Sequence, residues 1–366
     1  MKVNLNTIPF KEWGLGLDDF FVVSGPCSAE SEEQVVSTAK EVAKSERVKL
    51  LRAGIWKPRT RPNAFEGIGE IGLEWLNAAK QETGLPITTE VANAKHVELC
   101  LKHGVDVLWL GARSTVNPFT VQEIADALKG VDIPVMIKNP INPDLGLWVG
   151  ALERINQAGI TKLAAIHRGF SSFEKSPFRN IPKWSIPIEL KRILPEIEIV
   201  CDPSHIAGNR DLIPFIAQKA IDMNMDGLMI ESHIQPQVAL SDAQQQLKPA
   251  SLMALIDELH FRKPDSQDAE FRSHLEELRQ EIDEIDEQIL QSLGLRMKVA
   301  EKIGEYKRDN AVTILQVGRW DEILTKRINM AKALGLSDRF MNKFLAIIHE
   351  ESIAKQTDVM NAEAVK

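Results

Sequence analysis

Cysteine is scarce in this chain of 366 residues, which contains only Cys27, Cys100 and Cys201. Three cysteines cannot form a disulfide framework, so we expect a reducing compartment, the cytoplasm. No run of about 18 apolar residues occurs, which argues against a membrane-spanning helix, and the first residues lack the pattern of a secretory signal. Basic residues do not predominate either: 44 lysines and arginines against 52 acidic residues give a net charge of -8, which argues against a nucleic-acid-binding protein.

Proline and glycine become rare towards the end of the chain. Seventeen of the 18 prolines lie in residues 1–262, and only four of the 21 glycines follow residue 262. Since both residues punctuate loops, we predict many short elements in a first domain, 1–262, and a few long helices in a second domain, 273–366. The polar segment 263–272 is the predicted linker.

Short β-rich apolar runs alternate with amphipathic stretches through the first domain. Strands that alternate with helices pair in parallel, and eight such units in about 260 residues are typical of a (β/α)8 barrel, the TIM barrel. An open doubly wound sheet is disfavoured because no glycine-rich dinucleotide turn follows the first run. The predicted strands are 20–24, 50–53, 87–91, 107–110, 135–138, 163–167, 197–201 and 227–231.

Cationic residues gather where the predicted strands end, which is the catalytic face of such barrels. The guanidinium fork of arginine suits phosphate or carboxylate groups. Six cations on one rim are more than one phosphate needs, so we predict two anionic substrates. The cations are Arg52, Lys57, Arg59, Arg113, Lys138 and Arg168.

A second group on the same rim contains one thiol, one imidazole and two carboxylates. These residues follow strands one, seven and eight, which are neighbours in a closed barrel. A mixed set of sulfur, nitrogen and oxygen donors favours Mn2+, Fe2+, Co2+ or Zn2+. We predict one divalent ion per barrel; a Schiff-base aldolase using Lys138 is a weaker alternative because it leaves this group unexplained. The predicted ligands are Cys27, His205, Glu231 and Asp242.

The rim motifs resemble, in the same order, those of 3-deoxy-D-arabino-heptulosonate 7-phosphate (DAHP) synthases of the type I beta group. The resemblance implies condensation of phosphoenolpyruvate with D-erythrose 4-phosphate and water to DAHP and phosphate, the first step of the shikimate pathway. The motifs are GPCS at 25–28, KPRT at 57–60, TTEV at 88–91, GAR at 111–113, KNP at 138–140, HRGF at 167–170, DPSH at 202–205 and SDAQQ at 241–245.

The resemblance also assigns roles to single residues, with Mn2+ as the expected metal at the four ligands named above. Related octulosonate 8-phosphate synthases are the weaker alternative, because they usually have an Ala-Asn-Arg type sequence in place of KPRT. One departure from the DAHP synthase pattern is Arg61, which stands where many members of the family have serine. The expected phosphoenolpyruvate site is Arg52, Arg113, Lys138 and Arg168. The expected erythrose 4-phosphate site is Lys57, Pro58, Arg59 and Thr60. The expected catalytic residues of the barrel are Lys57, Glu90, Lys138 and His205, with Glu90 managing a proton of the attacking water.

The second domain has the periodicity of helices. The 3-4-3-4 spacing of apolar residues predicts a coiled-coil-like seam. Continuing that register places Arg296 on the seam, and Lys307 projects within roughly 20° of it, whereas Arg279 points about 100° away. Further helices are predicted at 318–334 and 337–355. The seam residues are Leu275, Leu278, Ile282, Ile285 and Ile289.

Residues 275–356 resemble all-helical chorismate mutases of the AroQ type, which have three helices per chain and are dimeric. The resemblance implies conversion of chorismate to prephenate, with Arg279 reaching the partner's site and with Lys307 and Gln356 as catalytic donors to the ether oxygen. Trp320 and Gln316 replace a common glutamate and aspartate, so the alternative is a module that mainly senses chorismate or prephenate. The expected chorismate site is Arg279, Arg296, Lys307, Arg319, Ser352 and Gln356.

These expectations define the partners of the chain. We expect an all-α three-helix domain that dimerises, so that the whole enzyme is a homodimer or a higher oligomer. We expect three small-molecule substrates, phosphoenolpyruvate, erythrose 4-phosphate and chorismate, with prephenate as a feedback ligand. We expect neither nucleic acid nor a membrane as a partner.

Overall fold

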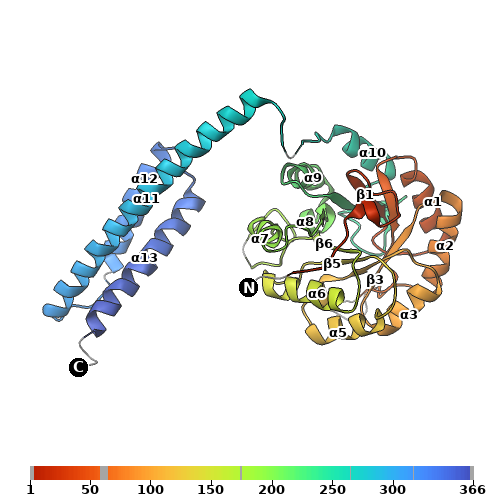
Figure 1. The fold of residues 1–366 in the computed structure, drawn as a ribbon, viewed down its shortest axis with the longest axis horizontal. Helices are drawn as coiled ribbons and strands as arrows, with labels where there is room; N and C mark the ends of the chain where they lie inside the picture. Colours follow the sequence, from red (N-terminus) through yellow and green to blue (C-terminus); the bar gives the residue numbers. More distant parts are fainter. Residues whose placement is uncertain (1–3, 58–64, 174, 264, 316, 363–366) are drawn as a thin grey trace. The chain divides into compact units, whose positions relative to one another are not determined.

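Two compact units make up the chain, Met1–Pro264 and Asp265–Lys366 (Figure 1). They are seen in a computed structural model that describes residues 4–57, 65–173, 175–263, 265–315 and 317–362. Among these residues, no helix combines the length and the apolar character that crossing a bilayer requires.

The first unit is a closed barrel of eight parallel strands. Each strand pairs with the next one along the chain, and β8 closes the barrel against β1, with Gly25 opposite Glu231. This register places the loops that follow β1 and β8 side by side. The predicted (β/α)8 barrel is therefore confirmed, with strand bounds within one or two residues of the expected ranges. The strands are β1 (Phe21–Gly25), β2 (Val48–Arg52), β3 (Ile87–Val91), β4 (Val107–Leu110), β5 (Val135–Lys138), β6 (Leu163–His167), β7 (Ile199–Cys201) and β8 (Gly227–Glu231).

Helices link the strands and surround the barrel (Figure 1). Polar caps set where several of them begin: Ser31 accepts a hydrogen bond from Gln34 N before α1, and Asn117, followed by Pro118, caps α5. The helices of this unit are α1 (Glu32–Val42), α2 (Ile71–Thr83), α3 (Ala94–Lys102), α4 (Ala112–Thr115), α5 (Pro118–Ala127), α6 (Leu145–Gln157), α7 (Ser185–Ile193), α8 (Pro203–Ala207), α9 (Ile213–Asp222) and α10 (Pro249–Glu258).

Apolar side chains pack on both faces of the strands. Inside the barrel, strand residues such as Trp109 and Met136 form one buried cluster, while the outer faces pack against the helices in another. Phe10, in the 3-10 helix η1 (Phe10–Glu12), joins the inner cluster, and its ring lies 4.9 Å from that of Phe21. Since Phe21 is the first residue of β1, this segment fills the N-terminal end of the barrel and leaves the opposite end for a site.

The described part of the second unit forms three helices, α11 (Ala269–Asp309), α12 (Val317–Ala333) and α13 (Asp338–Asn361), and confirms the expected all-α region. Helix α11 begins inside the predicted linker because Asp268 caps it by accepting a hydrogen bond from Phe271 N. The C-terminal half of α11 packs against α13 at Gly304, where a Cβ would lie 3.0 Å from the Cα of Gln356. Glycine at 304 therefore allows the two backbones to approach.

The N-terminal half of α11 carries the predicted apolar seam. Leu278, Ile282, Ile285 and Ile289 are 45%, 57%, 48% and 45% exposed within this chain. Four large apolar side chains at helical spacing form a stripe that water contacts along its length. Such a stripe is typical of a surface that another helix covers.

Candidate active site

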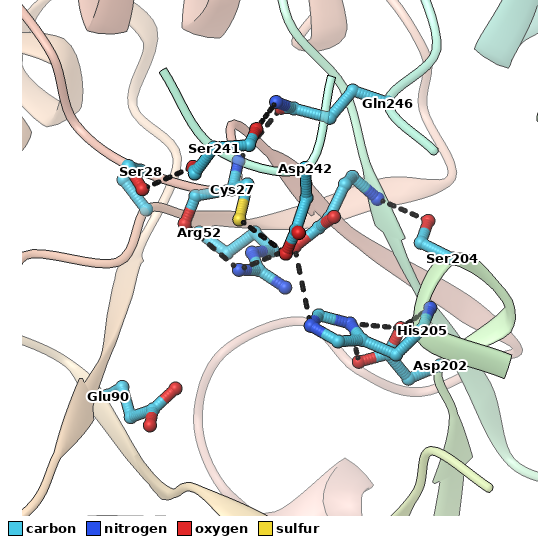
Figure 2. A network of polar contacts seen from close by, with 12 residues as sticks. Cys27, Ser28, Arg52, Glu90, Asp202, Ser204, His205, Ser241, Asp242 and Gln246 are labelled. Atoms are coloured by element: carbon cyan, nitrogen blue, oxygen red, sulfur yellow. Dashed lines mark hydrogen bonds and ion pairs between the residues drawn. The ribbon is translucent and has the colours of Figure 1, made fainter. Parts of the chain in front are cut away.

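Polar side chains from several strands converge at the C-terminal end of the barrel (Figure 2). Arg52, Lys138 and Glu231 are the last residues of β2, β5 and β8. Cys27 and His205 lie just beyond the ends of β1 and β7. The parallel strands therefore place side chains from distant parts of the sequence in one cluster, on the face where barrel enzymes carry their chemistry.

Three of the four predicted metal ligands form a compact group. Donor atoms of Cys27, Glu231 and Asp242 all lie within 4.8 Å of one another, and Cys27 Sγ is 3.4 Å from Asp242 Oδ2. The fourth, His205, is adjacent, with Nε2 lying 3.8 Å from Glu231 Oε1.

The imidazole of His205 is oriented by Asp202, which lies at the start of α8. His205 Nδ1 is 2.8 Å from Asp202 Oδ2, and the backbone N–H of His205 donates to Asp202 Oδ1. Asp202 thereby holds Nδ1 of the ring (Figure 2) and leaves Nε2 on the side of Glu231. A carboxylate behind the imidazole is the usual arrangement around a metal-binding histidine.

Hydrogen bonds clasp the loop after β1 to the loop after β8. Gln246 Oε1 accepts from Cys27 N at 2.9 Å, and the hydroxyls of Ser28 and Ser241 are 2.5 Å apart. Asp242 has a φ of 47°, a left-handed backbone conformation that aspartate tolerates better than most residues. The clasp and this turn together hold Asp242 next to Cys27.

In the predicted metal-ligand group, both carboxylates are held ionised and the thiol is neutral. Burial, reinforced by the charge of Glu231, raises the pKa of the Cys27 thiol to about 12. Burial opposes the charges of Glu231 and Asp242 as well, yet nearby His205 and the arginines Arg52 and Arg179 hold both pKa values below their usual range.

The group fits a divalent cation. Glu231 Oε1 is buried and, although Arg52 Nη2 lies 3.2 Å away, it accepts no hydrogen bond within the described part of the chain. A buried carboxylate oxygen without a hydrogen bond can accept a further partner. A thiol, an imidazole and two carboxylates are together suited to a borderline ion such as Mn2+, Fe2+, Co2+ or Zn2+.

Arg52 is a buried cation with unused donors. Its Nη2 lies 3.2 Å from Glu231 Oε1 and its guanidinium lies over the ring of Trp109, 5.0 Å from the centroid. Its Nε and Nη1 are buried, and neither donates to another described residue. Donors of a buried charged group are costly to leave unpaired, so Arg52 is arranged to bind an anion.

The other predicted phosphoenolpyruvate residues lie on the same rim. Lys138 Nζ is 2.8 Å from Asp202 Oδ2, and Arg168 Nη1 donates to Asn180 Oδ1 at 2.8 Å. Burial, with the charges of Arg179 and Arg113, lowers the pKa of Arg168 to about 10. A buried arginine whose pKa is lowered by neighbouring positive charges is typical of a site that an anion completes.

Glu90 is placed by the absence of a side chain at residue 111. A Cβ on Gly111 would lie 2.0 Å from Glu90 Oε1, so only glycine leaves room for this carboxylate. Glu90 Oε2 accepts a hydrogen bond from Trp109 Nε1 at 3.2 Å. These two contacts hold the carboxylate at the rim of the barrel. Among the described residues, it forms no ion pair with the cations predicted to bind the substrates.

The predicted erythrose 4-phosphate site is only partly visible. Lys57 Nζ lies 3.2 Å from Cys27 Sγ, which places this lysine beside the predicted metal ligands. Pro58, Arg59 and Thr60 lie outside the described residues, so their roles stay predictions.

Three polar residues that hold the site were not singled out from the sequence. Asp202 contacts both Lys138 and His205, Arg179 Nη1 is 3.0 Å from Asp242 Oδ1, and Gln245 Nε2 donates to Glu231 Oε2 at 2.7 Å. Asp202 and Gln245 belong to the DPSH and SDAQQ motifs, so the motifs contained a signal for them. Arg179 follows no strand directly, and nothing in its local sequence marks it.

A second polar cluster lies between α11 and α13. Arg296 Nη1 donates to Ser352 Oγ and, at 3.4 Å, to Ile348 O. Gln356 is 9% exposed, and its Oε1 has no hydrogen-bond partner among the described residues. Lys307 Nζ donates to Ile314 O at 2.5 Å.

The remaining predicted chorismate residues stand apart from this cluster or are not described. The Arg279 side chain is 63% exposed and lies 3.7 Å from Glu276 within the first half of α11. Arg319 is part of α12, but its side chain lies outside the described residues, as does Gln316.

Comparison with known proteins agrees with both resemblances. Residues 8–261 match the family model described as "DAHP synthetase I family". The chain belongs to the DAHP synthetase I family. Residues 278–357 match the model "Chorismate mutase type II". The chain is thus an enzyme that joins a DAHP synthase domain to a chorismate mutase domain.

Named relatives cover the DAHP synthase domain. A phospho-2-dehydro-3-deoxyheptonate aldolase of Thermotoga maritima is 31% identical over 245 residues, covering 67% of this chain and 70% of the relative. A 2-dehydro-3-deoxyphosphooctonate aldolase of Variovorax paradoxus is 27% identical over 272 residues, covering 67% of this chain and 91% of the relative. The crystal structure of the Thermotoga maritima DAHP synthase has a TM-score of 0.60 at 30% identity and covers 68% of this chain and 70% of that one.

Proposed function

We propose that the barrel condenses phosphoenolpyruvate with D-erythrose 4-phosphate and water in a reaction that depends on a divalent metal and yields DAHP and phosphate. The observation that carries this proposal is the buried guanidinium of Arg52, whose Nη2 lies 3.2 Å from Glu231 in the proposed metal-ligand group while its Nε and Nη1 remain unpaired among the described residues. A reaction between an enol phosphate and a metal-activated carbonyl needs a positive group that binds the phosphate compound next to a carboxylate that binds the metal.

The residues of the rim divide the chemistry between them. A divalent ion bound by Cys27, His205, Glu231 and Asp242 would supply Lewis-acid polarisation of the aldehyde oxygen. Binding of the phosphate and carboxylate groups then orients carbon 3 of phosphoenolpyruvate towards the aldehyde carbon. The residues with this binding role are Arg52, Arg113, Lys138 and Arg168.

The bonds change in a fixed order on this proposal. Carbon 3 forms a bond to the aldehyde carbon, carbon 2 takes up water, and phosphate leaves by cleavage of the bond between carbon 2 and oxygen. Glu90 takes a proton from that water, because its carboxylate stands on the rim with one hydrogen bond, from Trp109 Nε1. Lys57, with Pro58, Arg59 and Thr60, binds erythrose 4-phosphate.

The helical domain converts chorismate to prephenate on the same proposal. This pericyclic rearrangement needs compaction of the substrate and stabilisation of charge on the ether oxygen, and no covalent catalysis. Arg296 and Ser352 already form one hydrogen-bonded group, and the unpartnered Oε1 of Gln356 lies on the same helix. Arg279 would complete the site of a second chain, because its side chain is exposed on the half of α11 that carries the seam.

The proposal includes a homodimer that forms through the apolar seam of α11. It also includes feedback inhibition by prephenate. The exposed apolar stripe supports pairing of two helical domains. Prephenate is a dicarboxylate that would bind Arg296 and Lys307, and it would inhibit the barrel only if it binds two states of the enzyme with different affinity.

Both activities can be tested on the purified full chain. We expect DAHP formation to stop in the presence of a chelator and to return with Mn2+, while prephenate formation continues. Activity with arabinose 5-phosphate in place of erythrose 4-phosphate would favour the octulosonate alternative. A chain that binds prephenate without converting chorismate would favour the sensing module.

A further inference from the structure

Trp320 and His349 form a stacked pair in the helical domain. Their ring centroids are 4.0 Å apart with an interplanar angle of 14°. Trp320 belongs to α12 and His349 to α13, so the stack ties these two helices together. His349 precedes Ser352 by three residues and Gln356 by seven, and at about 100° per residue the three project from one side of α13.

That side of α13 is the one that Arg296 contacts. Arg296 Nη1 donates to Ser352 Oγ and to Ile348 O, the carbonyl immediately before His349. The Oε1 of Gln356 is buried without a partner among the described residues. A buried amide oxygen that lacks a donor, one turn along α13 from the serine that Arg296 contacts, indicates that a ligand completes this face.

The ring of His349 has hydrogen-bonding capacity to spare. Neither nitrogen bonds to another residue in the described part of the chain. Burial and the charge of Arg296 lower the pKa of His349. Near pH 7 the ring is therefore neutral and offers one N–H donor and one nitrogen acceptor.

We propose that His349 is a ligand-binding residue of the helical site and that it sets specificity by hydrogen-bonding the ring hydroxyl of chorismate. The inference rests on the proposed mutase activity. Arg296 supplies positive charge for a carboxylate, whereas a neutral imidazole adds none and suits an uncharged hydroxyl. Trp320 is a positioning residue, since its indole holds the imidazole plane.

A substrate lacking the hydroxyl provides the test. The full chain is assayed with chorismate and with an analogue in which hydrogen replaces the ring hydroxyl. His349→Phe keeps an aromatic ring on Trp320 and removes the hydrogen bond. We expect kcat/KM for chorismate to fall about fivefold, the effect of one neutral hydrogen bond, and kcat/KM for the analogue to stay constant. The preference for chorismate over the analogue then disappears.

Companion variants separate binding from packing. His349→Gln retains a donor and is expected to restore part of the preference, Trp320→Leu to lose part of it, and the exposed neighbour Glu350→Gln to keep it. A role in packing alone would lower the thermal unfolding temperature of His349→Phe and leave the preference unchanged, and that result would overturn the inference. If His349→Phe does not fold, His349→Leu is judged by the same two outcomes.

The failure of this inference is distinguishable from the failure of the mutase proposal. A wild-type chain that does not convert chorismate rejects both. A wild-type chain that converts chorismate and prefers it to the analogue, with the same preference in His349→Phe, rejects the inference about His349 alone.

Discussion

The two domains differ in how much of a site one chain provides. On the barrel rim, groups of the same chain hold one another: Asp202 contacts His205 and Lys138, and Arg179 contacts Asp242. In the helical domain, Arg279 lies exposed at 63%, far along α11 from Arg296. The difference indicates that strand ends can assemble a site within one chain, whereas on the proposed dimer the three helices would take part of their site from a second copy.

The largest effect should come from the barrel alone. Cys27→Ala removes one donor of the compact ligand group, so we expect DAHP formation to fall by more than about a hundredfold, since loss even of outer partners of a metal costs about 10–100-fold. Prephenate formation should stay at the wild-type level. Both rates are measured on the same preparation, with the bound metal counted by elemental analysis. Near-normal condensation by this variant would reject the ligand assignment.

Arg296→Ala is expected to do the opposite of Cys27→Ala: it should impair the mutase and spare the condensation. Loss of the cation that holds a carboxylate of chorismate in the reactive geometry should lower kcat/KM for chorismate by about 10²-fold and leave the condensation rate unchanged without prephenate. The exposed Arg339→Ala serves as a control for removal of a positive charge on a helix. If Arg296→Ala lost both activities equally, the two domains would not carry independent active sites.

The dimer prediction tests whether the helical site is shared. Ile282→Asp places a charge on the exposed seam, so we expect the chain to sediment as a monomer at micromolar concentration and to lose most of its mutase activity. Gln280→Asp adds the same charge about 160° away around the helix, measured by the shorter arc, and should remain dimeric. A wild-type chain that is monomeric, yet fully active as a mutase, contradicts the shared site.

The sequence predicted the barrel well because its signals are local. Each strand is a short apolar run closed by a polar motif, and Cys27, Glu231 and Asp242 meet because parallel strands end on one face. Arg179 could not be predicted in the same way, since it follows no strand directly and nothing in its local sequence marks its contact with Asp242. The stack of Trp320 on His349 was hidden for the same reason: it depends on how α12 and α13 pack.

A smaller effect is expected from the clasp between the loops after β1 and β8. Ser28→Ala with Ser241→Ala removes the hydroxyl pair while leaving every ligand in place. We expect the affinity for Mn2+ to weaken about tenfold, as for other partners that orient ligands. The affinity is measured by calorimetric titration of the metal-free chain. Ser37→Ala, on α1, is the matched control, and unchanged affinity in the double variant would assign the clasp to stability only.

The smallest effect lies at the opposite end of the barrel, where Glu198 accepts a hydrogen bond from Phe10 N. Burial raises the pKa of Glu198 from 4.5 to about 7. A carboxyl whose pKa is higher folded than unfolded binds more protons when folded, so its contribution makes stability fall as pH rises from about 4.5 to about 7. Glu198→Gln keeps an acceptor for Phe10 N without the charge. We expect the unfolding temperature of Glu198→Gln, measured relative to that of the wild type, to rise between pH 5 and pH 8. The rise should be no more than about 3 °C, because solvent screens this half-buried group. Both activities should be unchanged. A difference that does not vary with pH would show that Glu198 is ionised in the folded barrel throughout this range.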